Sequence, residues 1–300
     1  MNLPVVTVKL LGGLGNQLFA YAAAKALALR NGCPLVLDAF SGYQRDAFGR
    51  RFALGDFDLP DAVQPPRQPF GHPLAERLVR EFNDRLPLSW RTYLFENVDP
   101  NTFKHRYHPG VGSFRVRRNA YLNGNFTSPR YFDDQADAIR RALRWRQPPT
   151  DPALTALAAQ LADEQSVVVH FRLDRPETGS ALPAFSNLKK LSPRYYETAF
   201  ECLAQRLSRP RWFCFTDSPE RLDGFMVLPK NATVVSVPSA TDALWLMRQG
   251  RNFVLSNSTF AWWGAWLSGA PGTQVLAPPV YDFWDNLDIY PADWRVVEEG

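Results

Sequence analysis

Cysteine and histidine are both scarce in this chain. Its 300 residues include 3 cysteines and 4 histidines, and no CxxC pair occurs. Disulfide frameworks use paired cysteines, and zinc sites need clustered Cys and His ligands. We therefore expect Cys33, Cys202 and Cys214 to be reduced, buried thiols in a chain that works inside the cell. No metal or other cofactor is expected.

Long apolar runs and a strong excess of one charge are also absent. A membrane-spanning helix needs about 18 apolar residues in a row, and no run reaches that length. The short run at 5–11 has no signal-peptide cleavage pattern. Lys and Arg number 34 against 30 Asp and Glu, and the densest basic cluster is Arg115, Arg117 and Arg118. This small, scattered excess predicts no nucleic-acid partner. We expect a cytoplasmic chain, either free or peripheral to the inner face of the membrane, with no oligomeric state indicated.

What the sequence does contain is strand–helix alternation. A β-branched run at 5–11, an Ala- and Leu-rich stretch at 17–30 and an apolar run at 34–38 predict a βαβ unit. Asn31-Gly32 predicts the end of its helix. A Pro-rich loop is expected at 61–73 and a helix at 74–85, and the next strand is expected at 121–126.

The second half alternates more regularly. PPTDP at 148–152 predicts a linker, so we expect one domain at 1–150 and another at 151–300. Strands are predicted at 166–171, 211–215, 233–237, 252–256 and 274–277, and helices at 152–163, 193–208, 240–249 and 259–268. This spacing predicts an α/β fold with parallel sheets covered on both faces. Ligands of such sheets bind outside the carboxyl ends of the strands.

The first strand ends in GGLGN, residues 12–16. Gly13 and Gly15 would let backbone N–H groups approach a ligand at the start of a helix. We expect Asn16 and Gln17 to reach that ligand with neutral hydrogen bonds. A dinucleotide fingerprint needs a third glycine where this chain has Leu18, which disfavours an NAD-dependent dehydrogenase.

Two strands of the second half also end in polar residues. The run VVVHFRLD leads through His170 into Arg172 and Asp174. An arginine there can hold a phosphate with two hydrogen bonds, although a surface ion pair between Arg172 and Asp174 explains the pattern equally well. Asp217 follows the next strand and suits a base edge or ribose hydroxyl. Ser218 after it suits a helix N-cap, which is the alternative explanation.

A third strand leads into the hydroxyl-rich run SNST, residues 256–259. Hydroxyls and the N–H groups that open a helix together form an anion site, whereas helix capping needs only one such residue. Core packing explains at least one of the tryptophans that follow, Trp262, Trp263 and Trp266. His105 and His108 form an HxxH pair without a nearby carboxylate in the sequence, which disfavours a zinc site.

These stretches together resemble the α-1,2-fucosyltransferases, glycosyltransferase family 11. KLLGGLGNQLFAYAAAKALA resembles the family's GGLGNQLFQYA segment, YLNGNFTSPRYF its YLxGYFQSxKYF segment, and HFRLD its HxRRGD signature. LSPRYY at 191–196 and LWLMRQGRNFVLSNSTFAWWGAWL continue the resemblance in the family's order. SNSTFAWWGAWL is the most specific of these matches.

The resemblance implies a GT-B-like architecture of two facing Rossmann-like domains. It also implies a metal-independent, inverting transfer of L-fucose from GDP-L-fucose to the 2-hydroxyl of a terminal galactose in a glycan. The C-terminal domain would bind the donor, and the N-terminal domain would carry most of the acceptor site. Donor contacts are expected from Gly13, Gly15, Asn16, Gln17, His170, Arg172, Asp217, Asn257, Ser258, Thr259 and Phe260.

Three departures from the family pattern bear on function. The signature reads Arg172-Leu173-Asp174 where the family has Arg-Arg-Gly-Asp, Thr127 stands where the family usually has Gln, and Ala20 replaces another Gln. We expect Arg172 to stabilise the leaving diphosphate, with Asp174 and His170 as candidate general bases. The alternatives are a transferase of the same fold with another donor or acceptor, and a nucleotide-sugar- or glycan-binding protein that has lost turnover.

Overall fold

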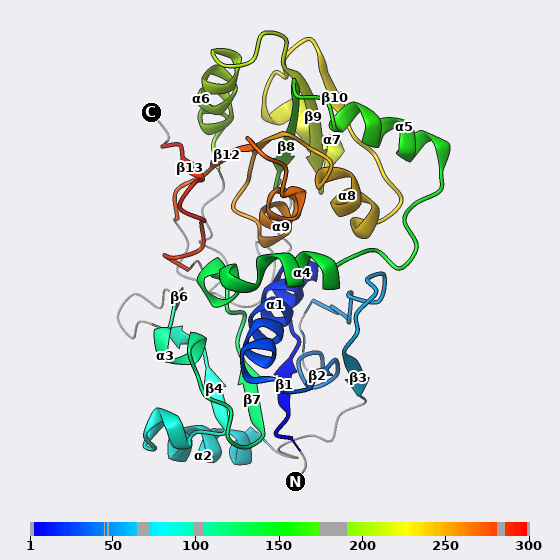
Figure 1. Cartoon of the computed structure of the whole chain (residues 1–300). Helices are drawn as coiled ribbons and strands as arrows, with labels where there is room; N and C mark the ends of the chain where they lie inside the picture. The colour runs from blue at the N-terminus through cyan, green and yellow to red at the C-terminus, as the bar shows by residue number, and fades with distance from the viewer. Residues whose placement is uncertain are drawn as a thin grey trace. The chain divides into compact units, whose positions relative to one another are not determined.

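The computed structural model describes residues 3–44, 46, 48–64, 73–98, 105–173, 191–280 and 286–298 (Figure 1). The chain forms two compact units. The first unit comprises Met1–Gln147 together with Phe283–Ile289, and the second comprises Pro148–Asp282 together with Tyr290–Gly300. The sequence predicts a boundary at 150 and does not predict that a segment from near the C-terminus returns to the first unit.

The first unit is built on a five-stranded parallel sheet in the order β3-β2-β1-β7-β4. Its strands are β1 (Val6–Lys9), β2 (Leu35–Asp38), β3 (Ala62–Gln64), β4 (Tyr93–Phe95) and β7 (Ala120–Asn123). Helix α1 (Leu14–Asn31) packs on this sheet through a largely buried, alanine-rich surface. It ends as predicted, because Gly32 adopts the left-handed conformation (φ 60°) and its N–H caps the last turn.

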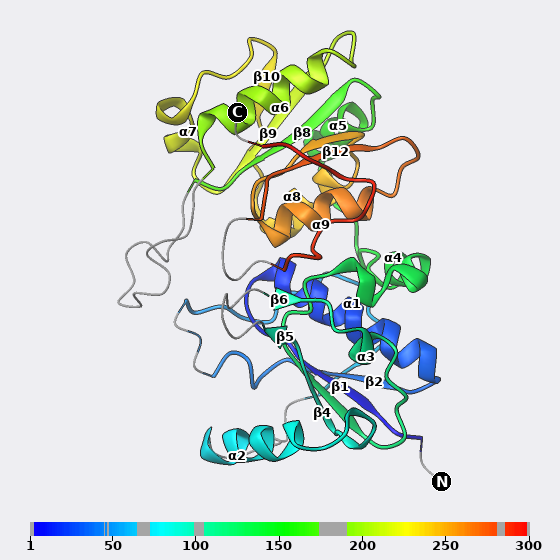
Figure 2. The same cartoon turned by 90° about the vertical axis from the view of Figure 1, so that its left-hand side faces the viewer.

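Shorter elements complete the first unit. They are α2 (Pro73–Asp84), η1 (Leu88–Trp90), α3 (Pro109–Gly112), η2 (Pro129–Tyr131), η3 (Asp133–Gln135) and α4 (Ala136–Ala142), together with the antiparallel pair β5 (Asn97–Val98) and β6 (His105–Arg106). Two views at right angles place α2 at the end of the sheet where its strands begin (Figure 1 and Figure 2).

The second unit holds a six-stranded parallel sheet in the order β10-β9-β8-β11-β12-β13. Its strands are β8 (Ser166–Phe171), β9 (Arg211–Thr216), β10 (Ala232–Val234), β11 (Asn252–Val254), β12 (Gln274–Ala277) and β13 (Arg295–Val296). Its helices are α5 (Pro152–Leu161), α6 (Pro193–Ala204), α7 (Pro219–Phe225), α8 (Ala240–Met247) and α9 (Thr259–Ser268).

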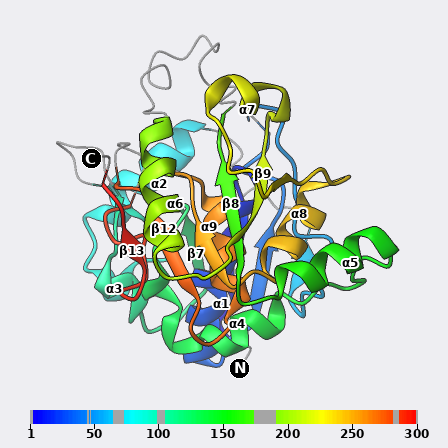
Figure 3. The same cartoon turned by 90° about the horizontal axis from the view of Figure 1, so that it is seen from above.

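Helices cover both faces of the second sheet, with α6 on one side and α5 and α8 on the other (Figure 3). All six residues of β8 are buried. Val167, Val169 and Phe171 belong to the core on the α6 side, whereas Val168 belongs to the opposite core. Side chains alternate across a strand, so a continuous apolar run fits only a sheet with two covered faces. The predicted class of α/β fold with parallel sheets is confirmed.

Several sequence expectations need correction. Residues 62–64 form edge strand β3, although the prolines after them predict a loop across 61–73. Helix α1 begins at Leu14 rather than 17, so Asn16 and Gln17 lie in its first turn. Ser218 precedes α7 as expected, but its side chain makes no capping hydrogen bond. No helix among the described residues is long and apolar enough to span a bilayer.

Candidate active site

The strand order of the second unit defines a switch point. The chain runs from β8 to β9 and β10 on one side, then crosses to β11 on the other side of β8. In doubly wound sheets, ligands bind at the carboxyl ends of the strands where the order reverses. Arg172, Asp217 and Ser256 follow the ends of β8, β9 and β11, so all three belong to this edge.

His170 and Ser256 meet across the switch point. The imidazole Nδ1 lies 2.8 Å from the hydroxyl Oγ of Ser256, and the ring centre lies 5.8 Å from that of Phe260. Burial, and secondarily the positive charge of Arg172, lowers the pKa of His170 to about 3. The imidazole is therefore neutral at neutral pH. It is a hydrogen-bonding group rather than an efficient base for a sugar hydroxyl.

Arg172 is held by the end of the neighbouring strand. Its Nε lies 3.2 Å from Oδ2 of Asp217, and the backbone N–H of Leu173 donates to Oδ1 of the same carboxylate at 2.9 Å. The Arg172 side chain is 32% exposed and that of Asp217 is 25% exposed. Asp217 thus ties β8 to β9 and orients a guanidinium that solvent still reaches. Asp174, the ion-pair partner considered from sequence, lies outside the described residues.

The residues of the hydroxyl-rich run before α9 differ in burial and in their hydrogen bonds. Ser256 is 3% exposed and bonded to His170, and its carbonyl accepts the N–H of Ser258 at 2.8 Å. Ser258 is the N-cap of α9, yet its side chain makes no capping hydrogen bond. Asn257, Ser258, Thr259 and Phe260 are all partly exposed. Capping therefore does not explain the run, and its half-exposed members lie beside the switch point.

The tryptophans that follow are core residues. Trp262, Trp263 and Trp266 are 1%, 0% and 6% exposed. Their rings pack against one another, and that of Trp262 also packs against Trp294 with the ring centres 5.2 Å apart. They fix α9 in the unit that also carries Arg172, and they lie too deep to contact a ligand.

In the first unit, the glycine-rich segment makes a tight turn before α1. Gly12 has φ +70°, and a Cβ there would lie 2.7 Å from Nδ2 of Asn16. Gly13 is the N-cap without a side-chain capping bond, and a Cβ there would meet open space. Gly15 is buried and Asn16 is partly exposed. The contacts predicted for Gly13, Gly15 and Asn16 remain predictions.

Gln17 has a different role from the ligand contact predicted for it. It is 0% exposed, and its Nε2 donates to the carbonyls of Gly12 and Arg51, each at 2.9 Å. Its Oε1 accepts the N–H of Ala53 at 2.8 Å. Both donors are engaged, so the side chain fastens the glycine turn to the segment at 51–53 instead of presenting its amide to a ligand.

Glu96 is a residue that the sequence does not single out. It is 7% exposed and follows β4, where its two oxygens accept the N–H groups of Asn125 and Thr127 at 2.8 and 3.2 Å. His105 Nδ1 lies 3.0 Å from the same carboxylate, so the HxxH pair does have a carboxylate neighbour. No local sequence pattern points to Glu96; in the structure Gly124 packs against it, and a Cβ there would come within 2.7 Å of Glu96 Cβ.

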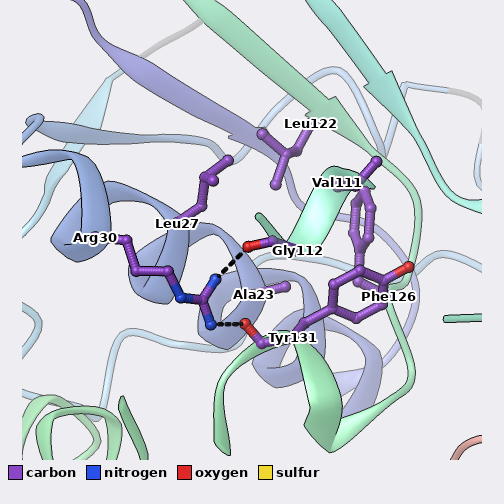
Figure 4. Close-up of a pocket in the computed structure, with 8 residues that line it drawn as sticks. All are labelled: Ala23, Leu27, Arg30, Val111, Gly112, Leu122, Phe126 and Tyr131. Atoms are coloured by element: carbon purple, nitrogen blue, oxygen red, sulfur yellow. Dashed lines mark hydrogen bonds between the residues drawn. The ribbon is translucent and has the colours of Figure 1, made fainter. Parts of the chain in front are cut away.

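A small void in the first unit lies between α1, α3 and β7 (Figure 4). It has no room for a water molecule. Arg30 borders it and donates to the carbonyls of Gly112 and Tyr131 at 2.8 and 2.6 Å. We therefore interpret it as a gap in the packing beside Arg30 and not as a binding pocket. Elsewhere in the described part of the chain, no three His, Cys, Asp or Glu residues lie together as a potential metal site.

Two doubly wound parallel sheets, one carrying arginine, histidine and hydroxyls at its switch point, define a glycosyltransferase fold of the GT-B type. A solved fucosyltransferase, NodZ from Bradyrhizobium in its selenomethionine form, shares this fold. It aligns with a TM-score of 0.50 at 17% identity, over 88% of this chain and 92% of that one.

The family follows from the sequence match. The model of glycosyl transferase family 11 matches residues 78–298, and the chain belongs to that family. It is 24% identical to an α-1,2-colitosyltransferase of Escherichia coli, over 98% of this chain and 99% of the relative. It is 26% identical to the O-antigen biosynthesis glycosyltransferase WbnK of the same organism, over 89% and 91%. The resemblance found in the sequence is confirmed, and the dehydrogenase hypothesis is wrong.

Proposed function

We propose that this chain is an inverting α-1,2-fucosyltransferase that moves L-fucose from GDP-L-fucose to the 2-hydroxyl of a terminal galactose in a glycan. The observation that carries the proposal is the half-exposed Arg172, held by Asp217 beside the neutral His170 at a switch point. Membership of glycosyl transferase family 11 supports the reaction class. The α-1,2 linkage in the name of one relative supports the linkage.

Arg172 supplies the positive field that the leaving group needs. As the fucosyl–oxygen bond breaks, negative charge gathers on the diphosphate, and a guanidinium fixed in advance stabilises that charge more than it stabilises the bound donor. Asp217 holds Nε, which sets the plane of the guanidinium. The partly exposed Ser258 and Thr259 at the start of α9 would add neutral hydrogen bonds to the same phosphates.

His170 fits a nucleotide contact better than a general base. Its ring is buried, bonded to Ser256 and neutral at neutral pH. A proton must still leave the acceptor hydroxyl, and Asp174 remains the predicted base. Comparing pH–rate profiles of the wild type and Asp174→Asn tests that role, since a base would show as the loss of the acid limb of the profile.

A second candidate donor follows from one observation, the colitosyltransferase among the relatives. Colitose is fucose without its 3-hydroxyl, so the two donors share the GDP moiety and the stereochemistry at the reacting carbon. A pocket with a polar partner for the 3-hydroxyl would reject colitose, and an apolar one would tolerate both. This alternative changes the sugar and keeps the diphosphate chemistry.

The deciding experiment has two stages. First, thermal unfolding is measured with GDP, GDP-fucose, GDP-colitose, UDP-galactose and NAD. A ligand at about 100 times its Kd adds about 2.7 kcal/mol to stability, so binding is easily seen. Second, transfer from the donors that bind is measured on β-galactosides with different reducing-end sugars, and the linkage of the product is determined.

We expect stabilisation by GDP and GDP-fucose and a new α-1,2 linkage on galactose. Stabilisation by UDP-galactose alone would overturn the donor proposal. Tight binding of GDP-fucose without hydrolysis or transfer to any acceptor would instead favour a binding protein that has lost turnover, in line with the shortened HFRLD signature.

A further inference from the structure

Helix α2 presents an apolar stripe to solvent. Leu74, Leu78 and Phe82 are spaced four residues apart, which places them on one side of the helix. They are 61%, 65% and 67% exposed. Large apolar side chains that are this exposed and adjacent are unusual on a soluble surface and mark sites of interaction.

The opposite side of α2 is the one attached to the sheet. Asn83 lies half a turn around the helix from Leu74 and is 3% exposed. Its Nδ2 donates to the carbonyl of Tyr93 at 2.8 Å, and its Oδ1 accepts the N–H of Tyr93 at 3.2 Å, so α2 is fastened to the start of β4. The stripe therefore faces away from the first unit by construction.

Exposed aromatic and basic residues lie just after α2 in the chain and just before the start of β7. Trp90, just after α2, is 60% exposed, and the guanidinium of Arg118 lies 5.6 Å from the centre of its ring. Arg117 and Arg118 are exposed, as is Arg85 at the end of α2. Arg118 of the short basic cluster is thus brought beside the exposed Trp90, which follows α2 in the chain. We call these seven residues, Leu74, Leu78, Phe82, Arg85, Trp90, Arg117 and Arg118, the α2 surface.

We propose that the α2 surface docks on an anionic lipid bilayer. Apolar side chains that enter the headgroup region, an interfacial tryptophan and flanking arginines are the features that hold a protein at a charged membrane. A second copy of this chain fits less well, because pairing this surface with itself would gather the three arginines of each copy, Arg85, Arg117 and Arg118, in one interface. Asn83 fastens α2 to the start of β4, so the α2 surface lies toward the end of the first sheet where its strands begin (Figure 2).

Vesicle co-sedimentation tests this docking with the full chain. Vesicles of phosphatidylglycerol and phosphatidylcholine are compared with vesicles of phosphatidylcholine alone, at 50 and 500 mM NaCl. We expect binding to the anionic vesicles at low salt and at least a tenfold loss at high salt, because screening weakens attraction to the surface charge.

Two variants and two matched controls locate the contact. Phe82→Glu and the double variant Arg117→Glu/Arg118→Glu should each lower the vesicle partition coefficient at least tenfold. Val227→Glu, at a 93% exposed position of the second unit, and Arg141→Glu/Arg144→Glu, at exposed positions of the first, should leave it unchanged. All four changes lie at exposed side chains, and circular dichroism checks that each variant is folded.

Light scattering on the same samples tests the alternative that a second copy of this chain, rather than a bilayer, covers the α2 surface. A dimer that Phe82→Glu dissociates, without vesicle binding by the wild type, would overturn the proposal and make the α2 surface an interface between copies. Vesicle binding that the control variants reduce as strongly as the α2-surface variants would also overturn it. Neither result depends on which sugar the chain transfers.

Discussion

The two units place polar side chains at the carboxyl ends of their strands and use them differently. In the first unit, Gln17, Asp38 and Glu96 are at most 7% exposed, and each accepts hydrogen bonds from backbone N–H groups of nearby loops. In the second unit, Arg172 and Asp217 pair with each other while 32% and 25% of their side chains remain exposed.

This difference separates residues that build a site from residues that act in it. A buried polar group must be paired internally, because leaving it unpaired costs about 1–3 kcal/mol. Once paired with the backbone, it fixes a loop and has little left for a ligand. A half-exposed charge held at one atom is oriented but still accessible. Residue type alone does not distinguish the two cases, whereas burial together with the partner does.

Arg172→Ala is the change with the largest expected effect. It removes the fixed positive charge at the leaving diphosphate, which is worth about 3–4 kcal/mol of transition-state stabilisation. We expect kcat/KM for fucosyl transfer to fall at least 100-fold, with the unfolding temperature nearly unchanged because the pair with Asp217 is half exposed. Arg221→Ala on α7, at a side chain that is 54% exposed, is the matched control and should keep full activity. A loss under threefold in folded Arg172→Ala would remove the arginine from the mechanism.

Gln17→Ala tests the role of the buried polar residues in the first unit. It removes the hydrogen bonds to the N–H of Ala53 and to the carbonyls of Gly12 and Arg51, of which the bond to Gly12 is fully buried, so we expect the free energy of unfolding to fall by about 2–3 kcal/mol. Urea unfolding measures this change, and Gln160→Ala, at an exposed position on α5, is the control. GDP affinity should be unchanged where the variant is folded. A tenfold weaker affinity with unchanged stability would restore the ligand contact first predicted for Gln17.

The sequence predicts the elements whose signal is local. The valines of β8 and the tryptophans of α9 are continuous apolar runs, and both elements lie close to where the pattern places them. Strands β3 and β13 are short edge strands of 3 and 2 residues. Each forms only because a neighbouring strand is there to pair with it. No local pattern encodes that neighbour, so both strands escape prediction.

The candidate site shows the same limit. The sequence singles out His170 and Arg172 because they stand at the end of a buried strand, and their roles toward a ligand stay predictions. The sequence also singles out Asp217 but does not predict that it holds Arg172, since Leu173 and Asp217 are 44 positions apart. Glu96 lies 29 and 31 positions from the two residues it holds. The return of 286–289 to the first unit depends on hydrogen bonds from Tyr107 and Ser128 to Asp288, across 181 and 160 positions.

His170→Gln should change how stability depends on pH. The histidine has a pKa of about 3 when folded and about 6.5 when unfolded, so between these values the unfolded chain binds the extra proton. Stability conferred by the neutral ring is therefore complete above pH 6.5 and lost as the pH falls, by up to about 1.4 kcal/mol per unit. Gln cannot titrate, so the fall in unfolding free energy from pH 6.5 to 5 should be about 2 kcal/mol smaller in the variant. Equal slopes in both proteins would mean that the pKa of His170 is the same in the folded and the unfolded chain.

Asp217→Asn has the smallest expected effect and separates two roles for this residue. Asparagine keeps an acceptor for the N–H of Leu173 but removes the charge opposite Arg172, so we expect kcat/KM to fall about fivefold, or about 1 kcal/mol. If Asp217 acts only by orienting Arg172, GDP and inosine diphosphate should weaken by the same factor. If it accepts the 2-amino group of guanine, as a nucleotide contact would, the wild type should prefer GDP and the variant should lose that preference, because inosine lacks the amino group. Both carboxylate oxygens already accept protein donors, so we expect the ratio of the Kd for inosine diphosphate to the Kd for GDP to be the same in the wild type and the variant. A ratio that falls to about 1 only in the variant would show that Asp217 contacts the guanine base.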